Sequence, residues 1–422
     1  MAETPHLILS LAGDKSISHR ALILAGMASG VSRLDNLSTG ADVRNTRACL
    51  EACGISIREE EAVYVRGQTW REPRIPLDGG NSGTTVRLLL GVLAGLGLSA
   101  EFRGDESLSR RPMKRILDPL ETMGIRTQSN HGRLPVRIAG KPVRGLTYDL
   151  PVASAQVKSA LLLAGLGAPE PTVLNEKAPT RDHTERLLQA LGVTLVQSGR
   201  TLRLEPPSSP WSAFELVIPG DPSTAAFLAA ATLLTPGMIV EFEGLSLNPT
   251  RLGFYRLLQE VGGQVSWVEE DQMMQEPRGR LRVVGGSRLQ PLNIDRRHVP
   301  GVIDELPILA VLAAFTPGRS VIRDAAELRV KESDRLRALF LGLTNLGVDV
   351  TEREDGLIIE GTSSMEIRDR RIRTFHDHRI AMAFAVAGAV SHQPLDLDDP
   401  DCVRISCPEF FRLLDQWERA VP

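Results

Sequence analysis

The chain repeats one short pattern six times, and this repetition limits its possible folds more than any other feature of the sequence. Each copy is a small polar cluster followed by a stretch rich in Ala, Leu and Gly. The six copies begin at Gly13, Gly80, Ser154, Gly220, Ile303 and His376. One or two copies could be unrelated helix starts, because Ser, Asp and Asn are favoured N-caps in any helix. Six copies, spaced about 65–85 residues apart, instead predict repeated supersecondary units.

A second pattern alternates with the first. It consists of an amphipathic helix, a glycine that ends the helix, and a short strand. Its copies are residues 43–57, 113–127, 183–195, 251–265 and 333–350, and a sixth helix at 408–420 has no strand after it. We therefore expect an α/β fold of α+β repeats, with one buried apolar helix, one half-exposed helix and several strands in each unit of about seventy residues.

The sixth helix has no strand after it, and this predicts how the chain divides into two lobes. We expect Leu7–Leu11 to complete the last unit, so that both ends of the chain share one lobe. The predicted lobes are residues 1–13 with 220–422, and residues 14–219 inserted between them, with three units in each.

Composition excludes several classes of protein. The 422 residues are 42% hydrophobic and 24% charged, which is typical of a globular chain with a substantial core. A net charge of −3 and only 4% aromatic residues argue against nucleic-acid binding. The longest apolar runs, Ala225–Leu234 and Ala381–Val390, are about half as long as a membrane span. The N-terminal residues lack the basic region of a secretory signal.

Four cysteines are too few for a disulfide framework in a chain of this length. They are Cys49, Cys53, Cys402 and Cys407. A metal site built from the two pairs is possible, but reduced and partly buried thiols are the favoured interpretation. We therefore expect a cytoplasmic location.

Basic residues gather at the predicted helix starts. Helix N-termini carry unpaired N–H groups and the positive end of the helix dipole, so they attract anions. The cations at these starts are Lys15, Arg20, Arg87, Arg111, Arg181, Arg251, Lys331, Arg335, His378 and Arg379. In a chain of net negative charge, this segregation predicts a small ligand with several negative charges.

Two acidic residues stand out against these cations. Asp304 interrupts an apolar run, where a carboxylate is costly without a partner or a role, and Glu332 lies between Lys331 and Arg335. Carboxylates in a cationic cleft can transfer protons, which makes both residues candidate catalysts. Asp304 could also be the N-cap of the helix that follows it, with or without a catalytic role.

Six motifs resemble those of the enolpyruvyl transferases, and within them the branch whose acceptor is shikimate 3-phosphate. The motifs are Gly13-Asp14-Lys15-Ser16-x-Ser18-x-Arg20, Gly80-Asn81-Ser82-Gly83-Thr84-x-x-Arg87, Leu108-Ser109-x-Arg111-Pro112, Ser154-Ala155-Gln156-x-Lys158, Arg329-Val330-Lys331-Glu332-Ser333-Asp334-Arg335 and Asp377-His378-Arg379. The resemblance runs essentially from end to end. It implies two lobes of three βαβαββ units each, with buried helices in an inverse α/β-barrel-like architecture.

The resemblance also implies a reaction. The enolpyruvyl group of phosphoenolpyruvate would pass to the 5-hydroxyl of shikimate 3-phosphate, and phosphate would be released on the route to chorismate and the aromatic amino acids. The two small molecules are the implied partners. No metal, organic cofactor, nucleic acid or membrane is implied, and a monomer is expected. Closure of the lobes would assemble the site.

Roles are carried over motif by motif. The resemblance implies Asp304 and Glu332 as the acid/base pair, with Lys15 stabilising developing charge. The implied ligands of shikimate 3-phosphate are Lys15, Ser16, Arg20, Ser154, Ala155, Gln156, Arg181, Asp304 and Lys331. The implied ligands of phosphoenolpyruvate are Lys15, Asn81, Gly83, Arg87, Arg111, Gln156, Arg335, His378 and Arg379.

The sequence departs from the common pattern at three positions. Ile405 replaces a usual Lys, Glu327 replaces a frequent Asn, and Ala155 replaces a frequent Ser. Together with Gly13-Asp14-Lys15, Arg181-x-His183-x-Glu185 and Asn248-x-Thr250-Arg251, these departures resemble the branch called class II, which is associated with glyphosate tolerance. Because Gly83 has no side chain to crowd the pocket, we expect intermediate tolerance.

Three other functions remain as alternatives. The sister enzyme that uses UDP-N-acetylglucosamine usually carries a cysteine in the loop that spans Gly104–Lys114 here, and this loop has none. An RNA-end-processing or RNA-binding protein built on similar repeats is disfavoured by the charge and the few aromatic residues. A catalytically inactive, anion-binding relative is disfavoured by the presence of both Asp304 and Glu332.

Overall fold

The computed structural model describes residues 5–363 and 365–422. By its contacts the chain divides into two compact units. Unit 1 comprises the described residues up to Ala12 together with Pro219–Asp271 and Pro277–Pro422. Unit 2 comprises Gly13–Ile218 and the short segment Gln272–Glu276. Residues 1–4, which the sequence assigns to the first lobe, lie outside the described residues.

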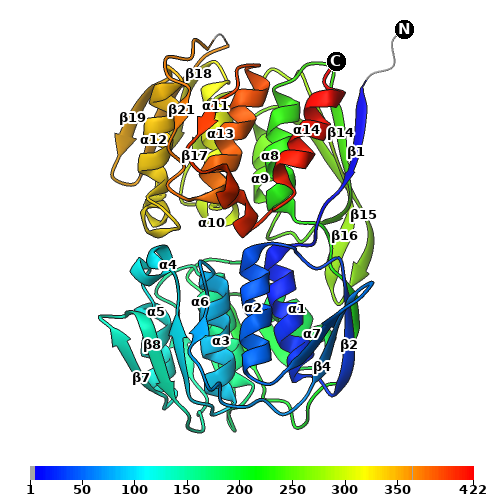
Figure 1. The fold of residues 1–422 in the computed structure, drawn as a ribbon, viewed down its shortest axis with the longest axis vertical. Helices are drawn as coiled ribbons and strands as arrows, with labels where there is room; N and C mark the ends of the chain where they lie inside the picture. The colour runs from blue at the N-terminus through cyan, green and yellow to red at the C-terminus, as the bar shows by residue number, and fades with distance from the viewer. Residues whose placement is uncertain (1–4, 364) are drawn as a thin grey trace. The chain divides into compact units, whose positions relative to one another are not determined.

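Unit 2 contains three copies of the predicted repeat (Figure 1). The first copy has α1 (Lys15–Met27), β2 (Gly30–Asp35), α2 (Ala41–Ala52), β3 (Ser56–Glu59), β4 (Val63–Gly67) and β13 (Glu215–Val217). The second has β5 (Leu77–Asp78), α3 (Gly83–Gly95), β6 (Ala100–Arg103), α4 (Glu106–Arg110), α5 (Lys114–Thr122), β7 (Arg126–Asn130) and β8 (Arg133–Ala139). The third has β9 (Thr147–Asp149), α6 (Ala155–Gly165), β10 (Thr172–Asn175), α7 (His183–Ala190), β11 (Leu195–Ser198) and β12 (Thr201–Leu204).

Unit 1 contains the other three. The first has β1 (His6–Ser10), α8 (Pro222–Leu233), β14 (Ile239–Ser246), α9 (Gly253–Glu260), β15 (Gln264–Met273) and β16 (Glu276–Val284). The second has β17 (Asn293–Ile294), α10 (Val299–Val302), α11 (Leu306–Ala314), β18 (Gly318–Ile322), the 3-10 helix η1 (Ala326–Val330), α12 (Arg335–Asn345), β19 (Asp349–Arg353) and β20 (Gly356–Gly361). The last has β21 (Arg371–Ile372), α13 (His378–Val390), β22 (Asp396–Leu397), the 3-10 helix η2 (Pro400–Ile405) and α14 (Phe410–Ala420).

The four-stranded sheets share one topology, which the sheet β5-β6-β8-β7 illustrates. The strand before the buried helix pairs in parallel with the strand after it, as Leu77 opposite Phe102 shows. A hairpin then adds two antiparallel strands. Along β8, Leu134, Val136 and Ile138 are buried and their neighbours are exposed, so the sheet buries one face, as the period of a strand requires.

In two of the six repeats, the first strand of the sheet comes from a distant part of the chain. β1 pairs in parallel with β14, with Leu7 opposite Val240, and β13 pairs in parallel with β2, with Leu216 opposite Leu34. The prediction that Leu7–Leu11 completes the last unit was therefore wrong. β1 packs beside α14 but pairs in the sheet of α8 and α9, and the described residues of the last repeat form the two-stranded sheet β21-β22. The open edge of β14 offers a longer parallel partner than the two residues of β22.

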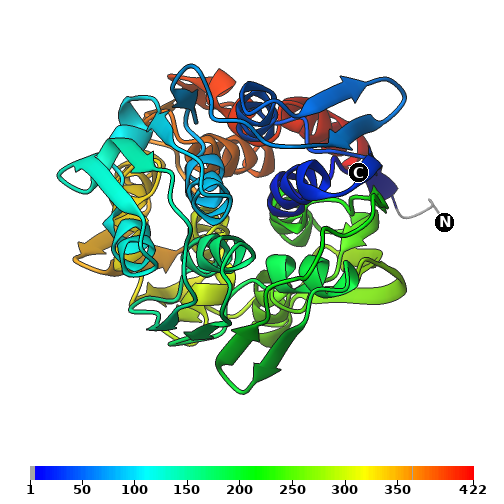
Figure 2. The ribbon, with the colours of Figure 1, turned by 90° about the horizontal axis from the view of Figure 1, so that it is seen from below.

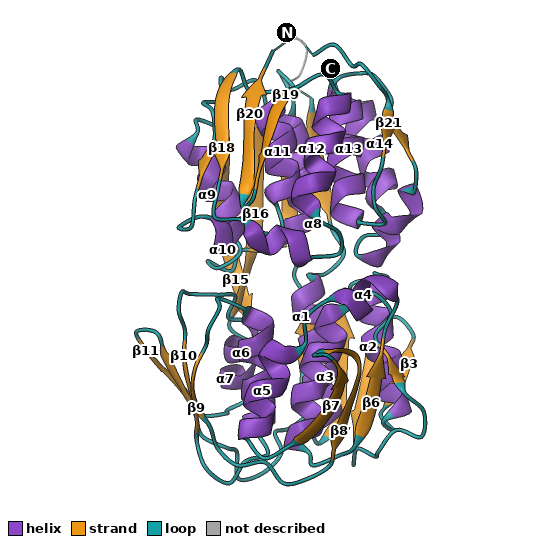
Figure 3. Ribbon diagram, turned by 90° about the vertical axis from the view of Figure 1, so that its left-hand side faces the viewer, coloured by secondary structure: helices purple, strands orange, loops and turns teal. Residues whose placement is uncertain are grey.

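The predicted burial of the apolar helices is confirmed. Every residue of α8 and α11 is buried, and α1, α3, α6 and α13 are nearly so. Figure 2 shows helices of the chain end-on with strands around them, and Figure 3 shows the same helices from the side. Each unit has its own apolar core. No helix in the described part of the chain is both long enough and apolar enough to cross a membrane.

Small residues let α3 and α6 approach very closely. A Cβ added at Gly91 would lie 2.1 Å from the carbonyl oxygen of Ala160, and one at Gly95 would lie 2.8 Å from that of Ala164. The two backbones are therefore in direct contact. Since α3 and α6 both carry predicted site residues at their first turns, this contact sets the spacing between those residues.

We predict that Gly91→Ala lowers the free energy of unfolding by about 1–3 kcal/mol, because the new methyl group overpacks the contact between α3 and α6. The matched control is Gly388→Ala in α13, where the added Cβ would have no neighbour closer than 3.4 Å. That control should be neutral or slightly stabilising. Urea unfolding of both variants measures the difference, and equal effects would contradict the prediction.

Candidate active site

Each buried helix of unit 2 begins with a capped first turn. Asp14 caps α1 by accepting from the Ile17 N–H, Ser82 caps α3 through the Thr85 N–H, and Ser154 caps α6 through the Val157 N–H. The caps hold three helix N-termini in place, each with a partial positive charge. The predicted residues Lys15, Ser16, Asn81, Gly83, Ser154, Ala155 and Gln156 all lie at these three starts.

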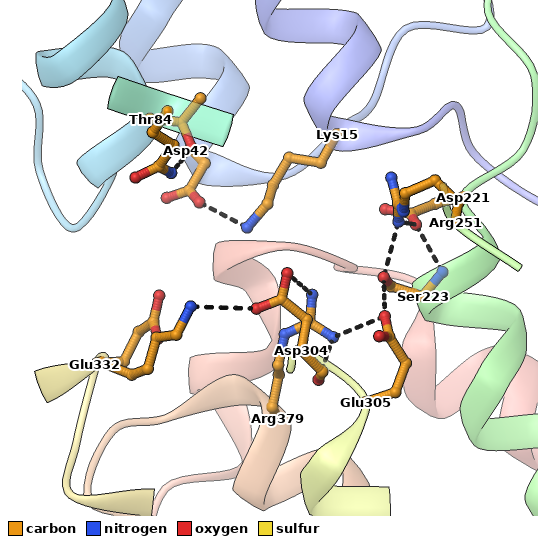
Figure 4. A network of polar contacts seen from close by, with 12 residues as sticks. Lys15, Asp42, Thr84, Asp221, Ser223, Arg251, Asp304, Glu305, Glu332 and Arg379 are labelled. Carbon is orange, nitrogen blue, oxygen red and sulfur yellow. Dashed lines mark hydrogen bonds and ion pairs between the residues drawn. The ribbon is translucent and has the colours of Figure 1, made fainter. Parts of the chain in front are cut away.

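Lys15 is held by a partner that the sequence does not reveal. Its Nζ lies 2.8 Å from Oδ2 of Asp42 in the first turn of α2 (Figure 4). Both side chains are largely buried, which strengthens the pair relative to one on the surface. The ammonium of Lys15 therefore has a fixed position. Asp42 lies 27 residues from Lys15 along the chain, so only the tertiary structure reveals this contact.

Two of the predicted arginines of unit 2, Arg87 and Arg111, are each oriented by an amide side chain. The Gln156 side-chain oxygen accepts from Nη1 of Arg87 at 2.6 Å, and its nitrogen donates to Oγ1 of Thr84 at 2.8 Å. Nη2 of Arg111 donates to the side-chain oxygen of Asn81 at 2.7 Å. Gln156 thus links the starts of α3 and α6. Four of the residues implied for phosphoenolpyruvate, namely Asn81, Arg87, Arg111 and Gln156, are engaged in these two contacts.

Arg20 lies deeper, and all its nitrogens have partners. Nε donates to Oγ1 of Thr184 at 2.7 Å, Nη2 to Oγ of Ser159 at 2.7 Å, and Nη1 to the Ser16 carbonyl at 2.9 Å. Burial lowers the pKa of Arg20 to about 10, and nearby Glu185 opposes this effect. The guanidinium therefore remains a cation near neutral pH and joins α1, α6 and α7.

A buried ion cluster supports the same region. Nζ of Lys158 lies 2.9 Å from Oε1 of Glu176 and 2.6 Å from Oε1 of Glu185, and all three side chains are at most 5% exposed. Burial by itself disfavours the charged ammonium, but the two carboxylates raise the pKa of Lys158 above its ordinary value. The motifs Ser154-Ala155-Gln156-x-Lys158 and Arg181-x-His183-x-Glu185 are thus joined by an ion pair.

In unit 1, Asp304 is surrounded by cations. Its carboxylate oxygens lie 3.7 Å from Lys331, 3.8 Å from Arg335 and 3.9 Å from Arg379, measured to the nearest side-chain nitrogens. Arg379 also donates to the Asp304 backbone carbonyl at 2.8 Å. The alternative of Asp304 as an N-cap was wrong, because the cap position of α11 is Glu305 and has no side-chain cap bond. The helix thus starts one residue later than the sequence pattern indicated.

Glu332 and Arg335 form a second contact in this group. Oε2 of Glu332 accepts from Nη2 of Arg335 at 2.6 Å, while Nε of Arg335 donates to Asp377, the N-cap of α13, at 2.8 Å. Burial by itself would lower the pKa of Arg335, but Asp377 and Glu332 raise it. Burial lowers the pKa of Lys331, although Asp304 opposes this. Asp304 and Glu332 thus share Arg335 as a cationic partner.

A further chain of polar contacts extends this group to α8 and α9 (Figure 4). Ser223 donates to Glu305, and Nη2 of Arg251 lies 2.8 Å from Oγ of Ser223 and 3.1 Å from Oδ1 of Asp221. Nη1 of Arg379 lies 3.9 Å from Glu305. The sequence placed Arg251 among the cations at helix starts but gave it no partner. Asp221 lies 30 residues away along the chain, so no spacing rule brings the two together.

The remaining predicted positions vary in their surroundings. Ile405 packs against the core of unit 1, so its apolar side chain replaces the usual cation there with packing. Glu327 is exposed in η1, and its charge acts on Lys331. His378 is buried at the start of α13. Arg181 is half-buried just before α7, close enough to Arg20 to lower the pKa of Arg20.

The four cysteines lie in the two apolar cores. All four cysteines are buried and unbridged, and burial raises the pKa of Cys49, Cys53 and Cys402 to about 12. Within residues 5–363 and 365–422, no group of three or more His, Cys, Asp or Glu side chains is arranged to hold a metal ion.

Repeated βαβαββ units with arginines gathered near helix starts are the features expected of an enolpyruvyl transferase, and comparison with known proteins agrees. The family model described as EPSP synthase (3-phosphoshikimate 1-carboxyvinyltransferase) matches residues 7–414. A 3-phosphoshikimate 1-carboxyvinyltransferase of Thermus thermophilus is 45% identical over 410 residues, covering 96% of this chain and 94% of the relative. One of Syntrophomonas wolfei is 42% identical over 413 residues, covering 96% of both chains.

The fold comparison leads to the same family. The structure of EPSP synthase from Acinetobacter baumannii superposes with a TM-score of 0.84 at 36% identity, covering 98% of this chain and 96% of the other. The chain belongs to the 3-phosphoshikimate 1-carboxyvinyltransferase (EPSP synthase) family. The resemblance inferred from the six motifs is confirmed, as is the mixed α/β fold in repeated units.

We predict that Lys158→Met lowers the free energy of unfolding by about 3–5 kcal/mol, because it leaves Glu176 and Glu185 buried without their cation. The matched control is Lys114→Met, which removes an exposed ion pair with Asp118 and should cost less than about 1 kcal/mol. Urea unfolding at neutral pH compares the two. A loss at Lys158 no larger than that at Lys114 would show that the buried cluster contributes little.

Proposed function

We propose that this chain transfers the enolpyruvyl group of phosphoenolpyruvate to the 5-hydroxyl of shikimate 3-phosphate and releases phosphate. The observation that carries the proposal is the gathering of buried and partly buried cations near helix starts in a family member whose net charge is −3. In unit 2 these cations include Arg20, Arg87 and Arg111, and in unit 1 they include Arg335 and Arg379. Each proposed substrate carries a phosphate and a carboxylate, the groups that arginine forks bind best.

The proposed ligands of the two substrates follow the motifs. For shikimate 3-phosphate they are Lys15, Ser16, Arg20, Ser154, Ala155, Gln156, Arg181, Asp304 and Lys331. For phosphoenolpyruvate they are Lys15, Asn81, Gly83, Arg87, Arg111, Gln156, Arg335, His378 and Arg379. None of these side chains is fully exposed, which is unusual for so many charged residues without a binding role. No metal or organic cofactor enters the proposed reaction.

The proposed reaction needs two proton transfers in its addition step and a third in its elimination step. The 5-hydroxyl loses a proton as its oxygen attacks C2 of phosphoenolpyruvate, and C3 gains one to become a methyl group. The resulting tetrahedral adduct then loses phosphate, and a proton leaves the methyl group to restore the double bond. Asp304 and Glu332 form the proposed acid/base pair, and Lys15 stabilises the charge that develops. The contacts of Asp304 with three cations and of Glu332 with Arg335 support these assignments.

Location in the cytoplasm and a monomeric state complete the proposal. The four buried, unbridged cysteines support a reducing compartment. Large exposed apolar side chains such as Ile75, Val196 and Val268 lie on separate segments of the chain, which disfavours an extensive subunit interface. Size-exclusion chromatography with light scattering tests the monomer, and cell fractionation tests the location.

The decisive experiment measures phosphate release from phosphoenolpyruvate with shikimate 3-phosphate as the acceptor. Release should require the acceptor and should be much slower with shikimate or UDP-N-acetylglucosamine. Turnover with UDP-N-acetylglucosamine would favour the sister enzyme instead. Absence of turnover with any acceptor, together with tight binding of shikimate 3-phosphate, would favour an inactive anion-binding relative.

We predict that Asp304→Ala and Glu332→Ala each lower kcat by roughly 10²–10⁴, the range for loss of a general acid or base. Both variants should fold, since each carboxylate is partly exposed. The control is Glu360→Ala, which removes a partly exposed carboxylate from β20 of the same unit. Steady-state kinetics and thermal melting give the comparison, and near-normal kcat in both variants would overturn the assignment.

We predict that Gly83→Ala raises the inhibition constant of glyphosate more than the KM for phosphoenolpyruvate. The added Cβ would lie 2.7 Å from Nη1 of Arg87 and 3.6 Å from Nη1 of Arg111, so the methyl group faces the proposed phosphate ligands. Overpacking here should cost the larger ligand about 1–3 kcal/mol. Inhibition measured against varied phosphoenolpyruvate tests this. An equal loss for substrate and inhibitor would show that Gly83 does not separate them.

A further inference from the structure

The first turn of α7 is bonded to three other parts of unit 2. Nδ1 of His183 lies 2.7 Å from Oε1 of Glu276, and Oγ1 of Thr184 accepts from Arg20 at 2.7 Å. Glu185 binds Lys158 of α6 at 2.6 Å, and Nη1 of Arg186 donates to the Gln275 carbonyl at 2.8 Å. Four consecutive residues thus contact α1, α6 and the segment Gln272–Glu276.

The segment Gln272–Glu276 is the tip of the β15–β16 hairpin. The rest of that hairpin belongs to unit 1, but the tip belongs to unit 2. Met273 and Met274 pack against the core of unit 2. Met274 and Gln275 have φ angles of 48° and 62°, so both central residues of this two-residue turn are left-handed without being glycine. Such a turn normally uses Asn-Gly, and the sequence here accepts backbone strain to place Glu276.

Charge explains why a carboxylate is placed at this tip. Arg20 and Arg181 are close enough for their positive charges to repel, and burial further disfavours the charge of Arg20. The negative charges of Glu185 and Glu276 are among those that raise the pKa of Arg20 against these two effects. Both Glu276 and its partner His183 are completely buried. A buried carboxylate is costly unless it is paired, so its presence beside two proposed phosphate ligands indicates a role there.

We propose that Glu276 is a positioning residue for the acceptor, which acts through His183 on the first turn of α7 and so holds Arg20 and Arg181 to receive the phosphate of shikimate 3-phosphate. Thr184 transmits this position to Arg20 by its hydrogen bond, and Arg181 lies two residues before His183. Glu276 touches neither substrate in this assignment. The inference rests on the proposed function and adds to it the element that makes the acceptor site selective for a phosphorylated ligand.

The test compares three variants of the full chain by steady-state kinetics and by calorimetric titration with shikimate 3-phosphate. Glu276→Gln keeps a hydrogen-bond acceptor for His183 but removes the charge. Arg186→Ala removes a partly exposed contact to the same tip without emptying the core. Glu270→Gln, which removes an exposed charge from β15 of the same hairpin, is the matched control.

We expect Glu276→Gln to raise the Kd and KM for shikimate 3-phosphate by roughly tenfold, or about 1.4 kcal/mol. The KM for phosphoenolpyruvate should change less than about twofold, and a general structural role would instead affect both substrates. Arg186→Ala should raise the KM for shikimate 3-phosphate by about threefold, and Glu270→Gln should change nothing. In an Arg181→Ala background the effect of Glu276→Gln should shrink, since the two substitutions act on one site.

The experiment distinguishes failure of the proposed function from failure of the positioning role of Glu276. If the unmodified chain releases no phosphate with shikimate 3-phosphate, the proposed function is wrong. If it does, but Glu276→Gln and Arg186→Ala bind the acceptor as tightly as the unmodified chain, the positioning role is wrong. Equally weakened binding of shikimate 3-phosphate and phosphoenolpyruvate would also overturn the positioning role. Should Glu276→Gln fail to fold, selective weakening by Arg186→Ala supports the inference and its absence refutes it.

Discussion

The burial of six almost wholly apolar helices is the constraint on which the structure depends. α8 and α11 have no exposed residue, so each must be enclosed by neighbouring helices and by the apolar faces of sheets. Charged residues are costly in a buried helix, and in these helices they are concentrated in the first two turns, where partners can pair with them. At the N-terminal end the unpaired N–H groups add a positive potential. The same packing that forms the core thus prepares places where anions can bind.

Charges at these places are controlled by partners rather than by solvent. Arg335 lies between Asp377 and Glu332, Asp304 is near three cations, and Lys158 is between two glutamates. Each pair restricts the rotamers of long side chains that would otherwise be mobile. A rigid arrangement loses less entropy when an anionic ligand binds. The cost is a set of buried ions whose removal one at a time would be destabilising.

Long-range strand pairing then joins segments that are distant in sequence. β1 completes the sheet of α8 and α9, while β13 completes that of α1 and α2. At the first crossing Gly13 is required, because a Cβ there would lie 2.0 Å from the Asn36 carbonyl oxygen. The tip of the β15–β16 hairpin is a further exchange, since Gln272–Glu276 belongs to unit 2. The chain therefore passes between the units more often than the repeat pattern indicated.

The sequence by itself determined the repeat, the buried and half-exposed helices and the family, because hydrophobic period, glycine stops and capping residues act locally. It also placed Lys15, Arg87, Asp304 and Glu332 at or near helix starts. Only the tertiary structure decided that Leu7 pairs beside Val240, that Asp42 holds Lys15, and that Glu276 reaches His183. These contacts join residues far apart along the chain, and any of several edges or carboxylates would have satisfied the local pattern. Packing of the whole chain selects among them.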